Sequence, residues 1–187
     1  MTEAGRQNSP IEWEGALVQR ARSGDTRAFE RLYREHAGRV YGLCLRMTRD
    51  PDLAQDCTQE TFINAWKALD RFETRSSLGT WLHRIAVNAA LAKRRKASPV
   101  TVASEGVEVE DEAVETQWTL ETPLEVQEIE TAIGDLPEGA RDVLVLYAIY
   151  GYSHAEAAEM LGVAEGTCKA QLHRARGLLR ERLGVNG

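Results

Sequence analysis

Apolar residues recur three and four positions apart along much of the chain, which is the spacing of amphipathic helices. The first series runs from Asp25 to Lys96 and divides into three predicted helices, with a break at residues 70–79. The recurring apolar positions are Phe29, Leu32, Tyr33, Val40, Cys44 and Met47 in the first helix, Leu53, Ala54, Cys57, Ala65, Trp66 and Leu69 in the second, and Leu82, Ile85, Ala86 and Ala89 in the third. We expect these positions to supply the core of a helical domain over residues 25–96.

Helix-start signals agree with this division. Asp25 precedes the first apolar series and Asp50 precedes the second, and aspartate is a favoured N-cap residue. Pro51 then occupies the first helical position, where its missing N–H leaves no hydrogen bond unmade. The sequence therefore predicts helices that begin directly after these two aspartates.

A second helical series fills residues 129–187. An apolar helix follows Pro137, and Ser153 with Glu156 forms a capping box for a short helix. Gly162 is suited to the left-handed residue that ends this helix, and a new helix is expected near Glu165. Val163 is expected to pack under the turn. Two helices joined by a short turn with a glycine form the pattern of a helix-turn-helix.

The register of the last helix separates its buried and exposed residues. Cys168, Leu172, Ala175 and Leu179 lie on one face and are predicted to be core contacts. The outward residues are therefore Lys169, Ala170, His173 and Arg174. They lie near the N-terminus of the helix, where a recognition helix contacts base edges. Arg176 and Arg180 lie toward the flank, where phosphates are the expected contact.

Charge is unevenly distributed. The chain has a net charge of -6, but nine of its acidic residues lie in residues 97–128, which contain no Lys or Arg. Outside this segment the chain has 20 acidic and 23 basic residues. This segment also lacks a sustained helical period and is predicted to be an exposed acidic linker. The fold expected is all-α, with two helical domains joined by an acidic linker, after an N-terminal extension of residues 1–24.

Two surface patterns within the first domain point to partners. Asp56, Gln59, Glu60 and Ile63 form a mixed face of the second helix, which is either a solvated surface or a docking surface. Trp81, Arg84, Asn88 and Arg95 form one stripe of the third helix, next to a Lys- and Arg-rich end. Cations and an aromatic ring suit nucleic acid. Alternatively, Trp81 belongs to the core and the cations complement the helix dipole.

Composition excludes several classes. The chain is 43% hydrophobic, as folded globular proteins are, and its longest apolar run is about half the roughly 20 residues of a membrane span. We expect a cytoplasmic protein without membrane insertion. The three cysteines and four histidines lack the spacing of a metal site or a disulfide framework. No catalytic motif, cofactor motif or small-molecule substrate site is predicted, so an enzyme is not expected.

Three blocks of the sequence together resemble a bacterial RNA polymerase sigma factor of the sigma-70 family, extracytoplasmic-function group. They span Ala28–Leu69, Arg75–Ala90 and Leu136–Leu179, in the order and at the separations of that family. The resemblance implies sigma region 2 at residues 25–96 and sigma region 4 at 129–187. It implies core RNA polymerase, promoter DNA and an anti-sigma factor as partners.

The resemblance also assigns roles to individual residues. It assigns binding to the clamp helices of core polymerase to Asp56, Gln59, Glu60 and Ile63. It assigns capture and melting of the minus-ten element to Arg71, Phe72, Glu73, Thr74, Arg75, Ser76, Ser77, Trp81, Arg84 and Asn88. It assigns contacts to the minus-thirty-five element to Thr167, Lys169, Ala170, His173, Arg174 and Arg176. The acidic linker resembles the segment that threads the polymerase cleft.

Three positions depart from the family pattern. Ala164 replaces a common capping serine, Ala170 replaces a small polar residue, and Leu78 replaces an aromatic residue after the two serines. These changes bear on promoter choice. The competing hypothesis is an autonomous helix-turn-helix regulator that binds DNA without polymerase, and it leaves the mixed face and the Trp81 stripe unexplained.

Overall fold

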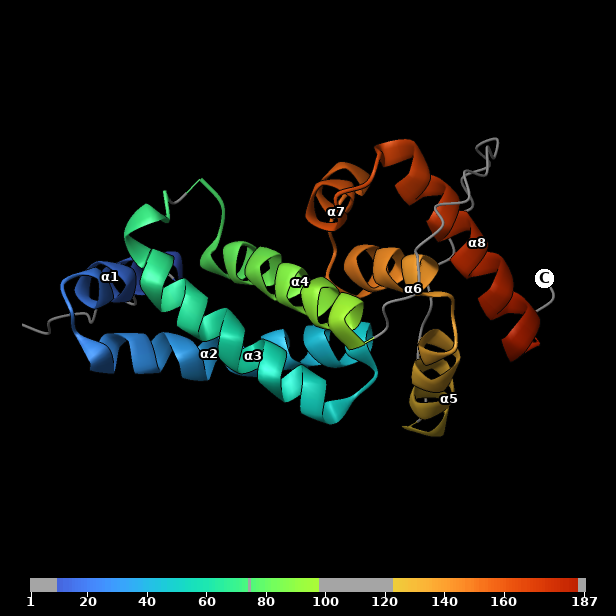
Figure 1. The fold of residues 1–187 in the computed structure, drawn as a ribbon, viewed down its shortest axis with the longest axis horizontal. Coiled ribbons are helices and arrows are strands. Elements are labelled where there is room, and N and C mark those ends of the chain that lie inside the picture. Colours follow the sequence, from blue (N-terminus) through green and yellow to red (C-terminus); the bar gives the residue numbers. More distant parts are fainter. Residues whose placement is uncertain (1–9, 74, 98–122, 185–187) are drawn as a thin grey trace, which may run out of the picture. The chain divides into compact units, whose positions relative to one another are not determined.

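The chain folds into two compact helical units. The computed structural model describes residues 10–73, 75–97 and 123–184, and every regular element within these ranges is a helix (Figure 1). The units comprise Met1–Lys93 and Arg94–Gly187, and each has its own buried apolar side chains. The predicted all-α architecture with two helical domains is thereby confirmed. None of the helices in these ranges combines the length and apolar composition needed to cross a membrane.

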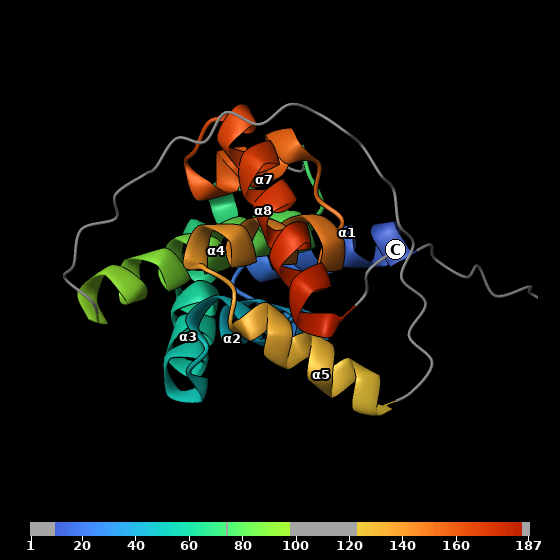
Figure 2. The same cartoon turned by 90° about the vertical axis from the view of Figure 1, so that its right-hand side faces the viewer.

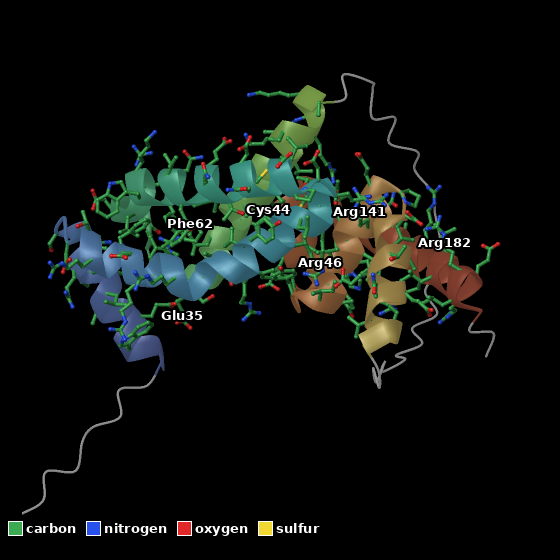
Figure 3. All side chains as sticks on the ribbon, turned by 90° about the horizontal axis from the view of Figure 1, so that it is seen from below. Glu35, Cys44, Arg46, Phe62, Arg141 and Arg182 are labelled. Atoms are coloured by element: carbon green, nitrogen blue, oxygen red, sulfur yellow. The ribbon has the colours of Figure 1, made fainter. Side chains whose placement is uncertain are left out.

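The first unit is built around two long antiparallel helices, α2 and α3. Its elements are α1 (Pro10–Arg22), α2 (Thr26–Thr48), α3 (Pro51–Ala68), the short 3₁₀ helix η1 (Leu69–Arg71) and α4 (Leu78–Ala97). Only Arg49 and Asp50 separate α2 from α3, so the two helices pack side by side (Figures 1 and 3). Arg49 adopts a left-handed conformation with φ of 58°, which ends α2 and turns the chain.

The core of this unit lies where the apolar stripes of the helices meet. Val40, Leu43, Cys44 and Met47 of α2 and Ala54, Cys57 and Ala65 of α3 are fully buried. Cys44 and Phe62 are labelled in Figure 3, where α2 and α3 run together. Trp66, which the pattern places in the core, is instead 38% exposed. Its ring packs edge-to-face on Phe29 at 4.8 Å, so one side is covered while the rest faces outward.

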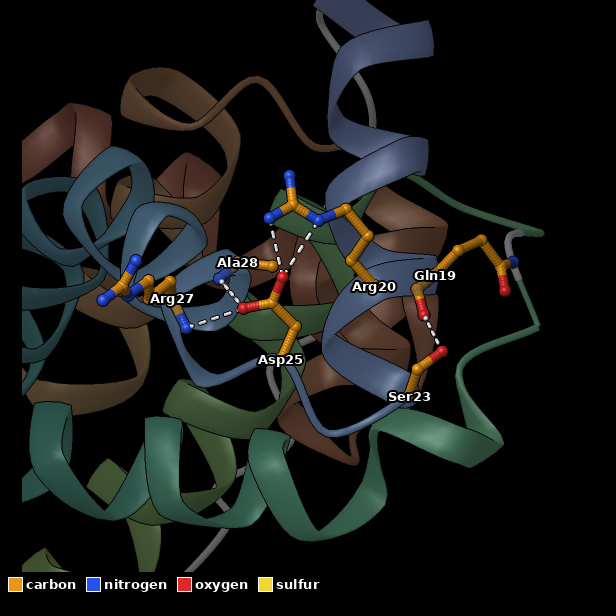
Figure 4. A network of polar contacts seen from close by, with 6 residues as sticks. All are labelled: Gln19, Arg20, Ser23, Asp25, Arg27 and Ala28. Atoms are coloured by element: carbon orange, nitrogen blue, oxygen red, sulfur yellow. Dashed lines mark hydrogen bonds and ion pairs between the residues drawn. The ribbon is translucent and has the colours of Figure 1, made fainter.

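The two predicted aspartate caps are present. Asp25 Oδ1 accepts hydrogen bonds from the backbone N–H groups of Arg27 and Ala28, at 3.0 and 3.1 Å (Figure 4). Its Oδ2 pairs with the Arg20 guanidinium at 2.6 Å, and this hydrogen bond lowers the pKa of Asp25. Asp50 caps α3 in the same way, with Pro51 at the first helical position. Local sequence therefore sets the start of both long helices.

The first unit begins earlier than the predicted boundary at residue 25. Helix α1 packs on α2, and its residues Leu17, Val18 and Ala21 are buried. Part of the predicted N-terminal extension is thus an integral helix of the domain. The short turn through Ser23 and Gly24 separates α1 from α2, and local spacing alone places a domain boundary at such a turn.

Residues 123–184 of the second unit form five helical elements. They are α5 (Pro123–Gly134), α6 (Glu138–Leu144), the π-helical turn η2 (Val145–Ile149), α7 (His154–Leu161) and α8 (Glu165–Leu183). Helix α8 packs against α6 and α7 (Figure 2), and Val143, Leu146, Ala157 and Leu172 are among the buried residues. Arg182 of α8 donates to the Ala132 carbonyl of α5 at 3.4 Å, which ties the two helices together.

Helix α5 corrects the predicted end of the acidic linker. It starts at Pro123, inside the segment 97–128, and residues 98–122 lie outside the described part of the chain. Ala132 and Ile133 are buried against the unit. The acidic residues of α5 gather in its first two turns, where negative charge favours a helix N-terminus. Their density gave the segment the composition of a linker although its last turns carry an apolar face.

Candidate nucleic-acid interface

The mixed face of α3 lies at the surface of the first unit. Asp56, Gln59 and Ile63 are exposed and Glu60 is half-buried, and their spacing places them on one side of the helix. Lys93 of α4 reaches this face, with its Nζ 3.3 Å from Glu60 Oε2 and 3.8 Å from Asp56 Oδ2. Burial acts to lower the pKa of Lys93, but the hydrogen bond to Glu60 and the two carboxylates outweigh it and raise that pKa. The face therefore combines an exposed aliphatic side chain with a charged border.

An aromatic cluster with two exposed members, Tyr33 and Trp66, adjoins this face and was missed by the sequence reasoning. The cluster consists of Phe29, Tyr33, Phe62 and Trp66. The Tyr33 and Phe62 rings are 4.7 Å apart, and Tyr33 is 41% exposed. Trp66 lies one turn after Ile63, which is 53% exposed, so apolar surface continues along α3. A large aromatic residue at the border of a polar face was the available signal, and it was read as core.

The loop between η1 and α4 is held at its two ends. Phe72 is only 6% exposed, and its ring packs on that of Trp81 with the centroids 5.1 Å apart. At the other end, the Ser77 hydroxyl accepts a hydrogen bond from Thr80 N–H at 3.1 Å and caps α4. Between these anchors, Glu73 and Arg75 form an exposed ion pair at 2.8 Å.

The predicted DNA-facing residues of this loop do not all reach the surface. Arg71, Glu73, Arg75, Ser76 and Ser77 are exposed, whereas Thr74 lies outside the described residues. The role of Phe72 at the minus-ten element stays a prediction, and in this structure its ring is buried and packs on Trp81 rather than facing outward.

The α4 stripe continues from this loop. Trp81 and Arg84 are half-buried and Asn88 is exposed, and the three lie on one side of the helix. The contact between Trp81 and the buried Phe72 ring joins the start of the loop to the α4 stripe. Together, the loop and the stripe offer hydroxyl, carboxylate, amide and guanidinium groups within a short length of chain, which is the kind of chemistry that recognises unpaired bases and phosphates.

The helix-turn-helix of the second unit is formed by α7 and α8. The capping box between Ser153 and Glu156 is present, and Gly162 adopts a left-handed conformation with φ of 69°, as predicted. Val163 does not pack under the turn and is 41% exposed. The N-cap of α8 is Ala164, which makes no side-chain hydrogen bond, so the turn relies on Gly162 and on packing rather than on a cap.

The register predicted for α8 is confirmed. Cys168, Leu172, Ala175 and Leu179 are buried on its inner face. Six residues are predicted to contact the minus-thirty-five element. Thr167, Lys169, His173 and Arg174 are exposed, and Ala170 and Arg176 are half-buried. Lys169 pairs with Glu165 at 3.4 Å across one exposed turn, a contact that DNA phosphates can replace.

Arg176 is held against the protein. Its guanidinium carbon lies 5.7 Å from the centroid of the Tyr147 ring, and that ring stacks on His154 with the centroids 4.5 Å apart. A cation over an aromatic face keeps its charge while losing some freedom. Arg176 therefore presents a fixed positive charge at the flank of α8, whereas His173 and Arg174 project freely on the outer face.

The cysteines take no part in these surfaces. Cys44, Cys57 and Cys168 are free thiols and all three are buried. Burial raises the pKa of Cys168 to about 11, with a smaller contribution from Glu165, so the thiol stays protonated near neutral pH. Cys168 is thus a core contact of α8, as the helical register predicts.

Comparison with known proteins gives these surfaces a family. The model described as Sigma-70 region 2 matches residues 32–99, and the model described as Sigma-70, region 4 matches residues 126–179. The ECF RNA polymerase sigma factor SigM of Mycobacterium tuberculosis is 35% identical over 164 residues, which are 87% of this chain and 80% of SigM. The RNA polymerase sigma-H factor of Pseudomonas aeruginosa is 34% identical over 175 residues, with 88% and 91% covered.

Solved structures agree with the sequence matches. The sigma factor RpoE from Bartonella quintana, in complex with the anti-sigma factor NepR, superposes with a TM-score of 0.65 at 29% identity, covering 85% of this chain and 98% of RpoE. CnrH, in complex with the cytosolic domain of CnrY, superposes with a TM-score of 0.62 at 28% identity, covering 94% and 99%. Family models, relatives and folds agree along most of the chain, and the protein belongs to the sigma-70 family as a sigma factor of the extracytoplasmic-function group.

Proposed function

We propose that the two units divide promoter recognition between them while the first unit also holds core RNA polymerase. The mixed α3 face, with the exposed Trp66 beside it, is the proposed docking surface for the clamp helices of the polymerase. The loop of residues 73–77 with the α4 stripe is the proposed minus-ten surface. The outer face of α8 is the proposed minus-thirty-five reader.

The outer face of α8 is the observation that carries this proposal. Four buried residues fix the rotation of the helix, and that rotation leaves Lys169, His173 and Arg174 exposed. A helix-turn-helix places such residues in the major groove, where lysine and arginine hydrogen-bond to guanine and cationic side chains contact phosphates.

The α8 face suits duplex DNA, whereas the loop and the α4 stripe suit the binding of bases that have left the duplex. Removing a base from the stack costs a few kcal/mol, so its pocket must return that energy through hydrogen bonds and stacking. The loop supplies the exposed hydroxyl groups of Ser76 and Ser77, and the α4 stripe supplies the half-buried side chains of Trp81 and Arg84. We expect single-stranded rather than duplex DNA to bind here, without any catalysis by this chain.

A protein inhibitor is part of the proposal. The structures of RpoE and CnrH were determined with NepR, an anti-sigma factor, and with the cytosolic domain of CnrY. We expect an anti-sigma factor to hold this protein inactive by covering the polymerase-binding and DNA-binding surfaces. Since its target is RNA polymerase, the expected place of action is the cytoplasm.

In vitro transcription with purified core polymerase and a promoter library tests the proposed function. We expect promoter-specific transcripts only when this protein is present. Tight binding to duplex operators without polymerase, together with no specific transcripts, would instead identify an autonomous DNA-binding regulator.

Replacing Arg174 by alanine should lower discrimination between correct and altered minus-thirty-five elements by about tenfold, since a good base contact is worth roughly 1–3 kcal/mol. The measurement is competitive binding of holoenzyme to promoters that differ only in that element. Arg180→Ala is the matched control on the same helix, because a phosphate contact weakens all sequences alike. If Arg174→Ala lost affinity for core polymerase as strongly as it lost promoter discrimination, the proposal that the first unit alone holds the polymerase would be contradicted.

A further inference from the structure

A single arginine joins α1 to the start of the η1–α4 loop. Arg22, in the last turn of α1, donates from Nε to the carbonyl of Leu69 at 3.1 Å. Its terminal NH2 group donates to the carbonyl of Phe72. These contacts span 47 and 50 residues of sequence, and the side chain is half-buried.

The chemistry of this contact suits the end of a helix. Leu69 begins η1 and Phe72 is its C-cap. The Leu69 carbonyl also accepts the Phe72 N–H at 3.2 Å, so Arg22 adds a second donor there, and the Phe72 carbonyl lies at the C-terminal end of this helical segment, where carbonyls lack intrahelical partners. A guanidinium complements the partial negative charge there, and its planar fork reaches two acceptors at once. Such charge-assisted hydrogen bonds are stronger than those between neutral groups.

The position of this contact along the chain gives it a functional meaning. The loop of residues 73–77 starts directly after Phe72 and ends at Ser77, which caps α4. Between the two ends, the described contacts of Glu73 and Arg75 are with each other at the surface, where they constrain little. Arg22 therefore fixes the entry of the loop, as Ser77 fixes its exit.

Helix α1 does not depend on Arg22 for its own attachment. Leu17 and Val18 are 5% and 2% exposed and pack in the domain core, as does Ala21 at 3%. Loss of the Arg22 guanidinium would leave these apolar contacts in place. The contact to the loop is thus separable from the packing of the helix that carries it.

We propose that Arg22 is a positioning residue for the loop of residues 73–77. Through Arg22, α1 holds this loop in the conformation required for promoter opening. This inference rests on the proposed function of the loop. It assigns a role to residues 10–22, which the sequence alone placed in an extension without a function.

The test uses holoenzyme assembled from the full chain and core polymerase, on a promoter selected from a library by the wild-type holoenzyme. Arg22→Met keeps the length of the side chain and removes all donors. Arg22→Lys keeps the charge and one group of donors. The matched control is Arg20→Met, because Arg20 is also on α1 but pairs with Asp25 at the surface.

Arg22→Met is expected to reduce promoter opening by about tenfold, since a hydrogen bond from a charged donor corresponds to roughly one power of ten in an equilibrium constant. Opening is measured by fluorescence of a base analogue in the minus-ten element. Holoenzyme affinity should stay within about twofold of wild type, because α1 remains packed. Arg22→Lys should recover part of the loss, and Arg20→Met should open the promoter normally.

Hydrogen exchange of the wild-type and Arg22→Lys chains gives a second measurement that does not depend on Arg22→Met folding. The amide of Phe72, which donates to Leu69 at 3.2 Å, is expected to lose protection in Arg22→Lys while amides in the middle of α2 keep theirs. Unchanged protection at Phe72 would overturn the proposal.

Two further outcomes would also overturn it. In one, Arg22→Met opens the promoter as wild type does. In the other, opening and holoenzyme affinity fall together, which would make Arg22 a residue of general stability. Failure of the proposed function itself is distinct, because the wild-type holoenzyme would then open no selected promoter, and the inference would fail with it.

Discussion

Replacing Ile63 by glutamate is expected to lower the affinity of this sigma factor for core RNA polymerase by about 100-fold while the first unit stays folded. Ile63 is 53% exposed, so its side chain contributes little to the core. At the centre of an interface, an apolar anchor of this kind is worth roughly 2–4 kcal/mol. The new carboxylate would also lie one turn from Glu60 and would replace the apolar contact of the proposed interface by a charge. Titration of fluorescently labelled protein with core polymerase measures the affinity.

Asn64→Glu is the matched control for this experiment. Asn64 is the next residue of α3 and is also exposed, but it lies about 100° around the helix from Ile63. The same glutamate at this position should leave core binding near its wild-type value. If both variants lost affinity equally, general charge would be responsible, and the proposed docking face of α3 would be wrong.

Acidification from pH 6.5 to pH 4 is expected to destabilise the first unit by about 3 kcal/mol through His83 alone. His83 is 6% exposed, and burial lowers its pKa to about 4, with help from the positive charges of Arg39 and His36. In the unfolded chain His83 is protonated as the pH falls through about 6.5, whereas in the folded unit it is protonated only near pH 4. Stability is therefore complete above pH 6.5 and falls through this window at about 1.4 kcal/mol per pH unit.

Tryptophan fluorescence during urea unfolding measures this effect in the first unit. Trp13, Trp66 and Trp81 belong to that unit, and a Trp118→Phe background removes the remaining tryptophan. In His83→Gln the slope of unfolding free energy against pH should decrease by the contribution of one proton. His173→Gln, which alters an exposed histidine of the second unit, should leave the slope unchanged. An unaltered slope in His83→Gln would show that His83 is not the group responsible.

Local signals in the sequence were sufficient for most of the helices, though not for α1 or the start of α5, and for the orientation of α8. Asp25, Asp50 and Ser153 cap helices through hydrogen bonds to N–H groups two or three residues away, so their effect is independent of the rest of the fold. The register of α8 follows from four apolar residues that only one rotation of the helix can bury together. These short-range rules are why the outer face of α8 was predictable residue by residue.

The proposed minus-ten surface was predictable only in part. The family pattern selected the exposed residues of the loop and the α4 stripe, but it also included Phe72, whose ring is buried. Its burial depends on the Trp81 ring, which approaches from a different helix. Periodicity contains no information about a single aromatic residue in an irregular segment, because such a segment has no repeating direction.

The sequence by itself determined most of the helices, the caps at Asp25, Asp50 and Ser153, the two-domain organisation and the outward face of α8, because these features depend mainly on residues close together in the chain. Only the tertiary structure decided that α1 belongs to the first unit, that Trp66 is exposed rather than buried, and that Arg22 reaches Leu69 and Phe72. Those features arise where whole helices meet, and in the case of Arg22 the segments in contact are 47 and 50 residues apart. Their geometry is set by the packing of whole helices rather than by any local pattern.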